Sequence, residues 1–162
     1  MKKFLLCAIG VVCILIQNSI LNYIDIFGFS INLLLIYVVV ISLYLDELEA
    51  GVIAGALGLI SDATVGGVFG INALILFTIG YVIALNREKL YKDSKSTIVV
   101  FIIIATLFDS VLNIASSSVL YHHYGIITLA VKGLAVAPVV NAVVGIILYI
   151  LTRKWVRKLK ED

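Results

Sequence analysis

Asp62 and Asp109 have the most unusual chemistry in this sequence, because each interrupts a long apolar stretch. An ionised carboxylate at the centre of a membrane helix costs about 2.5–3.5 kcal/mol on insertion scales, so each is expected to face inward toward a polar partner. Lys132 opens the last apolar stretch at a similar expected depth, and we hypothesise that the three charges form one polar cluster in the outer half of a bilayer. The alternative for Lys132 is a side chain that extends to interfacial water. The amides expected to support the cluster are Asn72, Asn113 and Asn141.

Other reactive side chains form no recognisable catalytic or metal-binding pattern. His122 and His123 are adjacent and therefore point in different directions, so a shared metal would need further ligands. Cys7 and Cys13 are six residues apart, on different faces of a helix, and are expected to be small apolar fillers. The serines at Ser116–Ser118 have no G-x-S-x-G context, and neither H-E-x-x-H nor a phosphate-binding loop occurs. We therefore expect no enzymatic activity, no metal and no cofactor.

Small residues recur along one side of the helix that we predict for about 48–65, the helix that contains Asp62. They stand at four-residue steps, with a G-x-x-x-G pair beside them, and a face this small lets the backbone of another helix come close. We expect it to be a face for helix packing, either within the protein or with a partner helix. Its residues are Ala50, Gly51, Ala54, Gly55 and Gly58.

Pro138 lies inside the last apolar stretch and is the only proline of the chain. A proline inside a helix removes one backbone hydrogen bond, so we expect a kink there. Asn141 stands about one turn further on and is placed to satisfy a freed backbone group.

The elements that must position these residues are membrane helices. The chain has 162 residues, of which 62% are hydrophobic and 14% charged, with a mean hydropathy of +1.17. These values predict one integral membrane domain, and the lack of regular polar alternation favours helices over a barrel. We predict an all-α bundle of six transmembrane helices, over about 4–21, 27–45, 48–65, 68–85, 97–119 and 133–151.

The placement of charge supports six spans with both termini in the cytoplasm. Basic residues gather before the first span, between the fourth and fifth spans, and after the sixth span. With this topology every lysine and arginine except Lys132 lies on the cytoplasmic side, as the positive-inside rule expects. The amino-terminal apolar run lacks a small-residue cleavage site, so we expect it to be retained as the first span. The net charge of +2 is too small to suggest nucleic acid, whereas the basic carboxyl-terminal tail is expected to contact anionic lipid.

Several of these stretches together resemble the MreD family of bacterial rod shape-determining membrane proteins. The resemblance covers most of the chain and is carried by four motifs. These are L-I-Q-N at 15–18 followed by N-L-L-L-I at 32–36, G-V-I-A-G-A-L-G-L-I-S-D at 51–62, G-V-F-G-I-N-A-L at 67–74, and P-V-V-N at 138–141. The resemblance implies a non-enzymatic scaffold in the cell membrane that binds MreC, whose single span is suited to the small-residue face. It also implies an indirect link from MreB filaments to RodA and its transpeptidase in peptidoglycan synthesis.

A second family is also similar in size and span number. The substrate-binding subunits of energy-coupling-factor transporters are six-span proteins that take up a vitamin or a metal from the outer side. They couple to their partner through small residues on the first span, where this sequence has Ala8 and Gly10 but no Ala-x-x-x-Ala row. The partners tell the two families apart: MreC with RodA in the first case, and an ATPase pair with a bound vitamin in the second. A bundle subunit of another kind is the third reading.

Overall fold

The computed structural model describes residues 2–21, 31–65, 69–87, 95–121 and 132–158. Within these ranges the chain forms α-helices and one short π-helix, and it contains no strand, so the predicted all-α class is correct for the described residues. Each of the six predicted spans overlaps one of the α-helices. In chain order the elements are α1 (Lys2–Ser19), α2 (Leu33–Ser42), α3 (Glu47–Val65), α4 (Ile71–Leu85), α5 (Lys95–Tyr121), the π-helix η3 (Lys132–Val136) and α7 (Ala137–Lys158).

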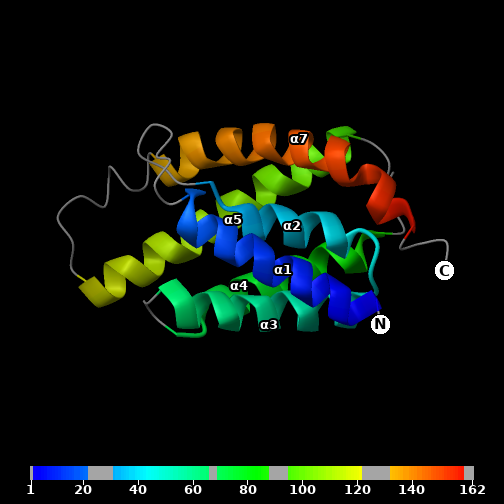
Figure 1. The fold of residues 1–162 in the computed structure, drawn as a ribbon. Coiled ribbons are helices and arrows are strands. Elements are labelled where there is room, and N and C mark those ends of the chain that lie inside the picture. The colour runs from blue at the N-terminus through cyan, green and yellow to red at the C-terminus, as the bar shows by residue number, and fades with distance from the viewer. Residues whose placement is uncertain (1, 22–30, 66–68, 88–94, 122–131, 159–162) are drawn as a thin grey trace.

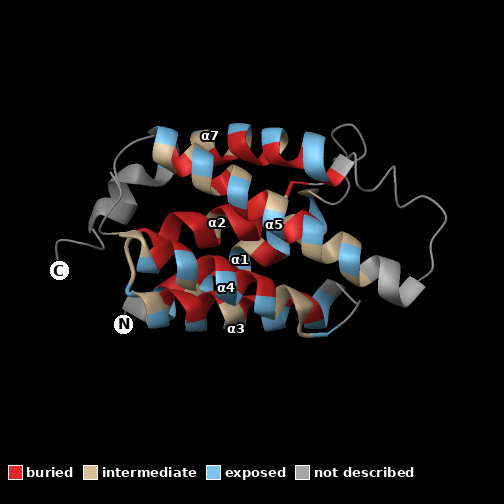
Figure 2. Cartoon of the chain, turned by 180° about the vertical axis from the view of Figure 1, so that it is seen from behind, coloured by how far each residue is buried: buried red, intermediate tan, exposed pale blue. Residues whose placement is uncertain are grey.

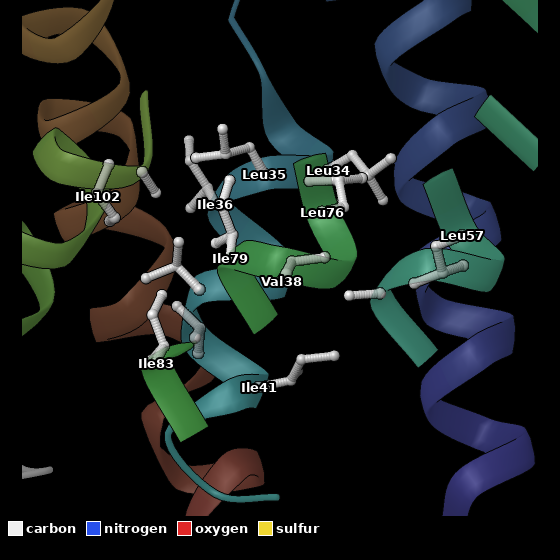
Figure 3. Close-up of a cluster of buried hydrophobic side chains, with 14 of the residues drawn as sticks. Leu34, Leu35, Ile36, Val38, Ile41, Leu57, Leu76, Ile79, Ile83 and Ile102 are labelled. Atoms are coloured by element: carbon white, nitrogen blue, oxygen red, sulfur yellow. The ribbon is translucent and has the colours of Figure 1, made fainter. Parts of the chain in front are cut away.

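Helix α2 is the centre of the bundle (Figure 1), where it contacts α1, α3, α4, α5 and α7. All of its residues except Tyr37 are buried (Figure 2). It carries no charge and is apolar on every side, which suits a helix that other helices surround. In Figure 3, Ile79 and Ile83 of α4 and Ile102 of α5 lie around the α2 side chains.

The outward faces of the helices are also apolar. Phe4 on α1, Leu74 on α4 and Leu151 on α7 are respectively 81%, 70% and 69% exposed. Two helical stretches, Ser96–Ser116 and Gly133–Leu151, are long and apolar enough to cross a membrane. An apolar outer surface of this extent is typical of a protein that lies in lipid. The count of six spans stays a prediction.

The helix around Pro138 changes its type instead of simply bending. The π-helix η3 ends at Val136, and α7 begins at Ala137, one residue before the proline. A proline is tolerated in the first turn of an α-helix, because the backbone N–H that it lacks has no partner at that position. Pro138 thus lies in the first turn of α7, directly after the π-helix, and the predicted kink stays a prediction.

Candidate functional site

The small-residue face of α3 packs against α4, the next helix in the chain. A Cβ atom built on Gly58 would lie 2.5 Å from the Cα atom of Ala73, and one built on Gly80 would lie 2.9 Å from the carbonyl oxygen of Ala50. Ala50 and Ala54 have no exposed surface. The two backbones come this close because neither helix has a larger side chain at the contact points. The helix that lies on this face is thus α4 of the same chain.

The glycine pair on the edge of this face supports an aromatic ring. A Cβ atom on Gly51 would lie 3.1 Å from the ring of Phe77, and one on Gly55 would lie 3.4 Å from the Phe77 Cβ atom. Phe77 is stacked on Tyr81, with ring centroids 6.2 Å apart. Gly51 is buried and Gly55 is half-buried. Binding of a partner helix along the part of α3 that α4 leaves exposed remains a prediction.

Asp62, at the end of the same row, caps the start of α4. Its Oδ2 atom accepts hydrogen bonds from the backbone N–H groups of Gly70, at 2.9 Å, and Ala73, at 3.3 Å. The first N–H groups of a helix have no partner within the helix, and the positive end of the helix dipole favours a carboxylate. Gly70 permits the turn because its φ of +97° is accessible to glycine at little cost. The buried carboxylate of Asp62 therefore has a structural partner in the α3–α4 turn.

Asp109 belongs to a different polar cluster, which joins α2, α5 and α7. One carboxylate oxygen accepts a hydrogen bond from the Asn113 amide at 2.9 Å, and the other accepts one from the Asn32 amide at 3.4 Å. The Asn32 side chain also caps α2, because its Oδ1 atom accepts a hydrogen bond from the N–H of Leu35 at 3.0 Å. That bond determines the orientation of the amide, so its NH₂ group faces Asp109.

Asn141 extends this cluster into α7. Its Oδ1 atom accepts a hydrogen bond from the backbone N–H of Asn32 at 3.1 Å, and its Nδ2 atom donates to the Thr106 hydroxyl at 3.2 Å. Close by in sequence, the Ser110 hydroxyl donates to the carbonyl of Gly133 at 2.8 Å, which ties α5 to the π-helix. Asn141 and Thr106 are each 1% exposed. Buried polar groups need such partners, so these bonds fix how the three helices meet.

The structure brings together part of the predicted cluster and separates the rest. Asp109, Asn113 and Asn141 are linked through Asn32, whereas the described hydrogen bonds of Asp62 go to the α3–α4 turn. The side chain of Lys132 lies outside the described residues, as do His122 and His123. The hypothesis that Asp62 and Asp109 share one cluster is therefore corrected, because the two carboxylates bond to groups on different helices.

Sequence reasoning did not place Asn32 or Thr106 in the Asp109 cluster, and it also missed the nearby Ser110. Thr106 and Ser110 were overlooked because their hydroxyls are short and common in membrane helices. A usable signal was present, since Thr106, Asp109, Ser110 and Asn113 follow the spacing i, i+3, i+4 and i+7. That spacing puts all four side chains on one face of α5.

The hydrogen bonds of this cluster hold helices together, which is a structural role. The described donors to the Asp109 carboxylate are the amides of Asn32 and Asn113, which hold it as an acceptor between helices. Among the described residues, no group of three or more His, Cys, Asp or Glu side chains could hold a metal ion. The Ser116 hydroxyl donates to the carbonyl of Leu112 in its own helix, at 2.7 Å. We identify no catalytic arrangement in the part of the chain that the structure describes.

Further polar contacts attach the first helix. The backbone N–H of Leu34 donates to the Gln17 side chain at 3.0 Å, and the Tyr37 hydroxyl donates to the carbonyl of Leu6 at 2.7 Å. Gly10 of α1 packs on the Leu57 side chain of α3. These contacts hold α1 against α2 and α3, and they use Gly10 for packing within the chain.

Comparison with known proteins identifies the same family that the sequence motifs resemble. The family model described as rod shape-determining protein MreD matches residues 1–159. Neither a curated protein nor a solved structure matches the chain. The family match covers nearly all of the 162 residues, including every helix described above. This chain therefore belongs to the MreD family of rod shape-determining proteins.

Proposed function

We propose that this protein is a non-enzymatic scaffold of the cell-elongation machinery in the bacterial plasma membrane. Its direct partner would be MreC, through which it would help to couple MreB filaments to RodA and its transpeptidase during peptidoglycan synthesis. The observation that carries the proposal is the nearly full-length match to a rod shape family, whose members are membrane proteins.

The distribution of polar groups supports a scaffold. The buried carboxylates of Asp62 and Asp109 are engaged with backbone N–H groups and amides of neighbouring helices. Such bonds hold helices in place and present no reactive atom to a substrate. The apolar outer faces of the helices supply surface for lipid and for the span of a partner.

The test is affinity purification of the tagged protein from a mild detergent extract of cells that produce it at its normal level. We expect MreC and RodA to co-purify, and we expect cells depleted of the protein to lose their rod shape. Recovery of an ATPase pair together with a bound vitamin would contradict the proposal and support a transporter subunit. Normal rods after depletion would contradict a role in shape.

The contact with MreC can be mapped with single cysteines on two exposed faces. Val52 lies on α3, beside the small-residue row, and is 62% exposed, while Val143 on α7 is 54% exposed and serves as the matched control. Cross-linking of MreC to Val52→Cys but not to Val143→Cys would support a contact along α3. The reverse pattern would place the contact on α7 and exclude the small-residue edge.

A further inference from the structure

Two groups of helices in the bundle are each held together by contacts that fix one helix against another. Helices α3 and α4 form the first group, in which the backbones meet at Gly58 and Gly80 and the Asp62 carboxylate caps the start of α4. This pair lies on the opposite side of α2 from α7 (Figures 1 and 2). Close backbone contacts and directional hydrogen bonds leave little freedom to slide, so α3 and α4 should behave as one rigid unit.

The second group contains α2, α5 and α7. The hydrogen bonds of Asn32 and Asn141 connect all three helices, and the Ser110 hydroxyl donates to the carbonyl of Gly133 in the π-helix. Each of these bonds joins a buried or part-buried polar group to another element, where it is costly to break. These helices therefore form a second rigid unit.

Helix α1 is attached mainly to the second unit, through its two hydrogen bonds with α2. Toward α3, the Asn18 side chain donates to the Thr64 hydroxyl at an exposed position, where water can replace either group. Gly10 also packs on the side chain of Leu57, which can change its rotamer. The contacts of α1 with α3 therefore permit a small displacement.

The contact between the two units is of a different kind, because it consists of apolar side-chain packing. The described hydrogen bonds of α4 go to Asp62 of α3 or stay within α4 and its caps. Branched side chains of α4 pack around α2 (Figure 3), and a groove of about 160 Å³ lies between α4 and α5. Its walls include Val82 on α4 and Ile104 on α5, which are 45% and 55% exposed. Helices packed in this way can slide by small steps without breaking a hydrogen bond.

The chain connects the two units at one end of the bundle, through residues 43–46 between α2 and α3. Arg87, just beyond α4, forms an ion pair with Asp46 in this connection. Both helices of the first unit are thus held at this end. Hinges are commonly a few residues at the ends of elements, so a movement about 43–46 would be largest at the far end, where α3 ends and α4 begins.

We propose that α3 and α4 move as one rigid unit against the unit of α2, α5 and α7, with residues 43–46 as the hinge. The groove between α4 and α5 closes and opens in this movement, because there α4 can approach α5 without overpacking. A protein that binds one of the two arrangements better would shift the balance between them. The movement does not depend on the identity of the partners proposed above.

The experiment measures distances between pairs of nitroxide labels by double electron–electron resonance, on the full chain in lipid nanodiscs. Cys7→Ala and Cys13→Ala remove the native cysteines, so that only introduced cysteines are labelled. The test pair joins Leu74 near the start of α4 to Val111 on α5, and both sites are exposed.

Three other pairs serve as controls. Leu59 with Leu74 lies within the first unit, and Val111 with Val139 lies within the second unit, so each shares a label site with the test pair. A pair near the hinge also spans the two units. It joins Leu85 at the end of α4 to Val100 near the start of α5.

We expect the distance distribution of the test pair to be about twice as wide as those of the three control pairs, or to have two maxima. A test pair as narrow as the controls would overturn the movement. An equally wide distribution for Leu59 with Leu74 would overturn the rigid unit of α3 and α4, and one for Leu85 with Val100 would overturn the hinge.

A groove-filling variant tests where the movement is absorbed. Val82→Phe adds a ring to the groove wall and should remove the short-distance part of the test pair's distribution, while the pair within the first unit stays unchanged. Val143→Phe is the matched control, because Val143 is exposed on α7 and does not line the groove. An unaltered test pair in Val82→Phe, or an equal change in Val143→Phe, would overturn the role of the groove.

Discussion

The α3–α4 contact leads to a sharp prediction, because two glycines on the same helix face should respond oppositely to the same substitution. In Gly58→Ala the new methyl group would lie 2.5 Å from the Ala73 Cα atom and 2.8 Å from the Asn72 carbonyl oxygen. In Gly55→Ala the closest atoms are 3.4 Å away and belong to the Phe77 side chain, which is an ordinary contact. The two variants add the same atoms to the same helix.

The expected magnitudes follow from these distances. The methyl group at position 58 meets backbone that cannot rotate away, so the helices must separate by about 1 Å, and overpacking of this kind costs about 3 kcal/mol. Replacement of a helical glycine by alanine raises the unfolding free energy by about 1 kcal/mol, because alanine has the higher helix propensity. The net loss of unfolding free energy is therefore about 2 kcal/mol for Gly58→Ala. Gly55→Ala causes no such overpacking, so its unfolding free energy should rise by about 0.5–1 kcal/mol through helix propensity alone.

The assay is reversible unfolding in mixed micelles with increasing SDS, followed by circular dichroism, for the native protein and the two variants. Gly58→Ala should unfold at lower SDS and Gly55→Ala at equal or higher SDS. Equal or greater stability of Gly58→Ala would refute the close backbone approach of α3 and α4. Parallel destabilisation of both variants would show that the whole face is tightly covered.

Substitutions at three further positions test the polar contacts. Asn32→Ala should lower the unfolding free energy by about 2 kcal/mol, because it removes both a helix cap and a donor to Asp109. Asn32→Ser should retain the cap and lose only about 1 kcal/mol. Equal losses in the two variants would show that the cap adds nothing, and an unchanged stability of Asn32→Ser would show that the amide bridge adds nothing. Asp62→Leu leaves two N–H groups at the start of α4 without their acceptor and should lower the unfolding free energy by about 2–4 kcal/mol. Asp62→Asn keeps an acceptor and should lower it by about 1 kcal/mol. The same SDS titration measures both variants, and an equal stability of the two would contradict the capping role. Arg87→Ala removes the ion pair with Asp46, whose side chain is 64% exposed. The unfolding free energy should change by less than about 1 kcal/mol, because water and salt screen such a pair. A larger loss that is the same in low and high salt would contradict a solvent-screened pair.

Several features followed from local sequence alone. The apolar stretches predicted the helices, because a long run of apolar residues in lipid must satisfy its backbone hydrogen bonds internally. The small-residue row predicted a close helix contact. Pro138 predicted a kink inside the last span, whereas the structure places this residue in the first turn of α7, after a π-helix. The four motifs predicted the family, and the family match confirms it.

The partners of the buried polar groups depended on the tertiary structure. Asp62 and Asp109 look alike in sequence, yet one caps α4 and the other joins α5 to the start of α2. Which atoms a side chain reaches depends on how each helix is rotated and placed against its neighbours. That rotation is set by packing across the whole bundle, above all around the buried helix α2, and the periodicity of one helix does not contain it. For the same reason the sequence predicted a face for close packing, while only the assembled bundle showed that α4 occupies it.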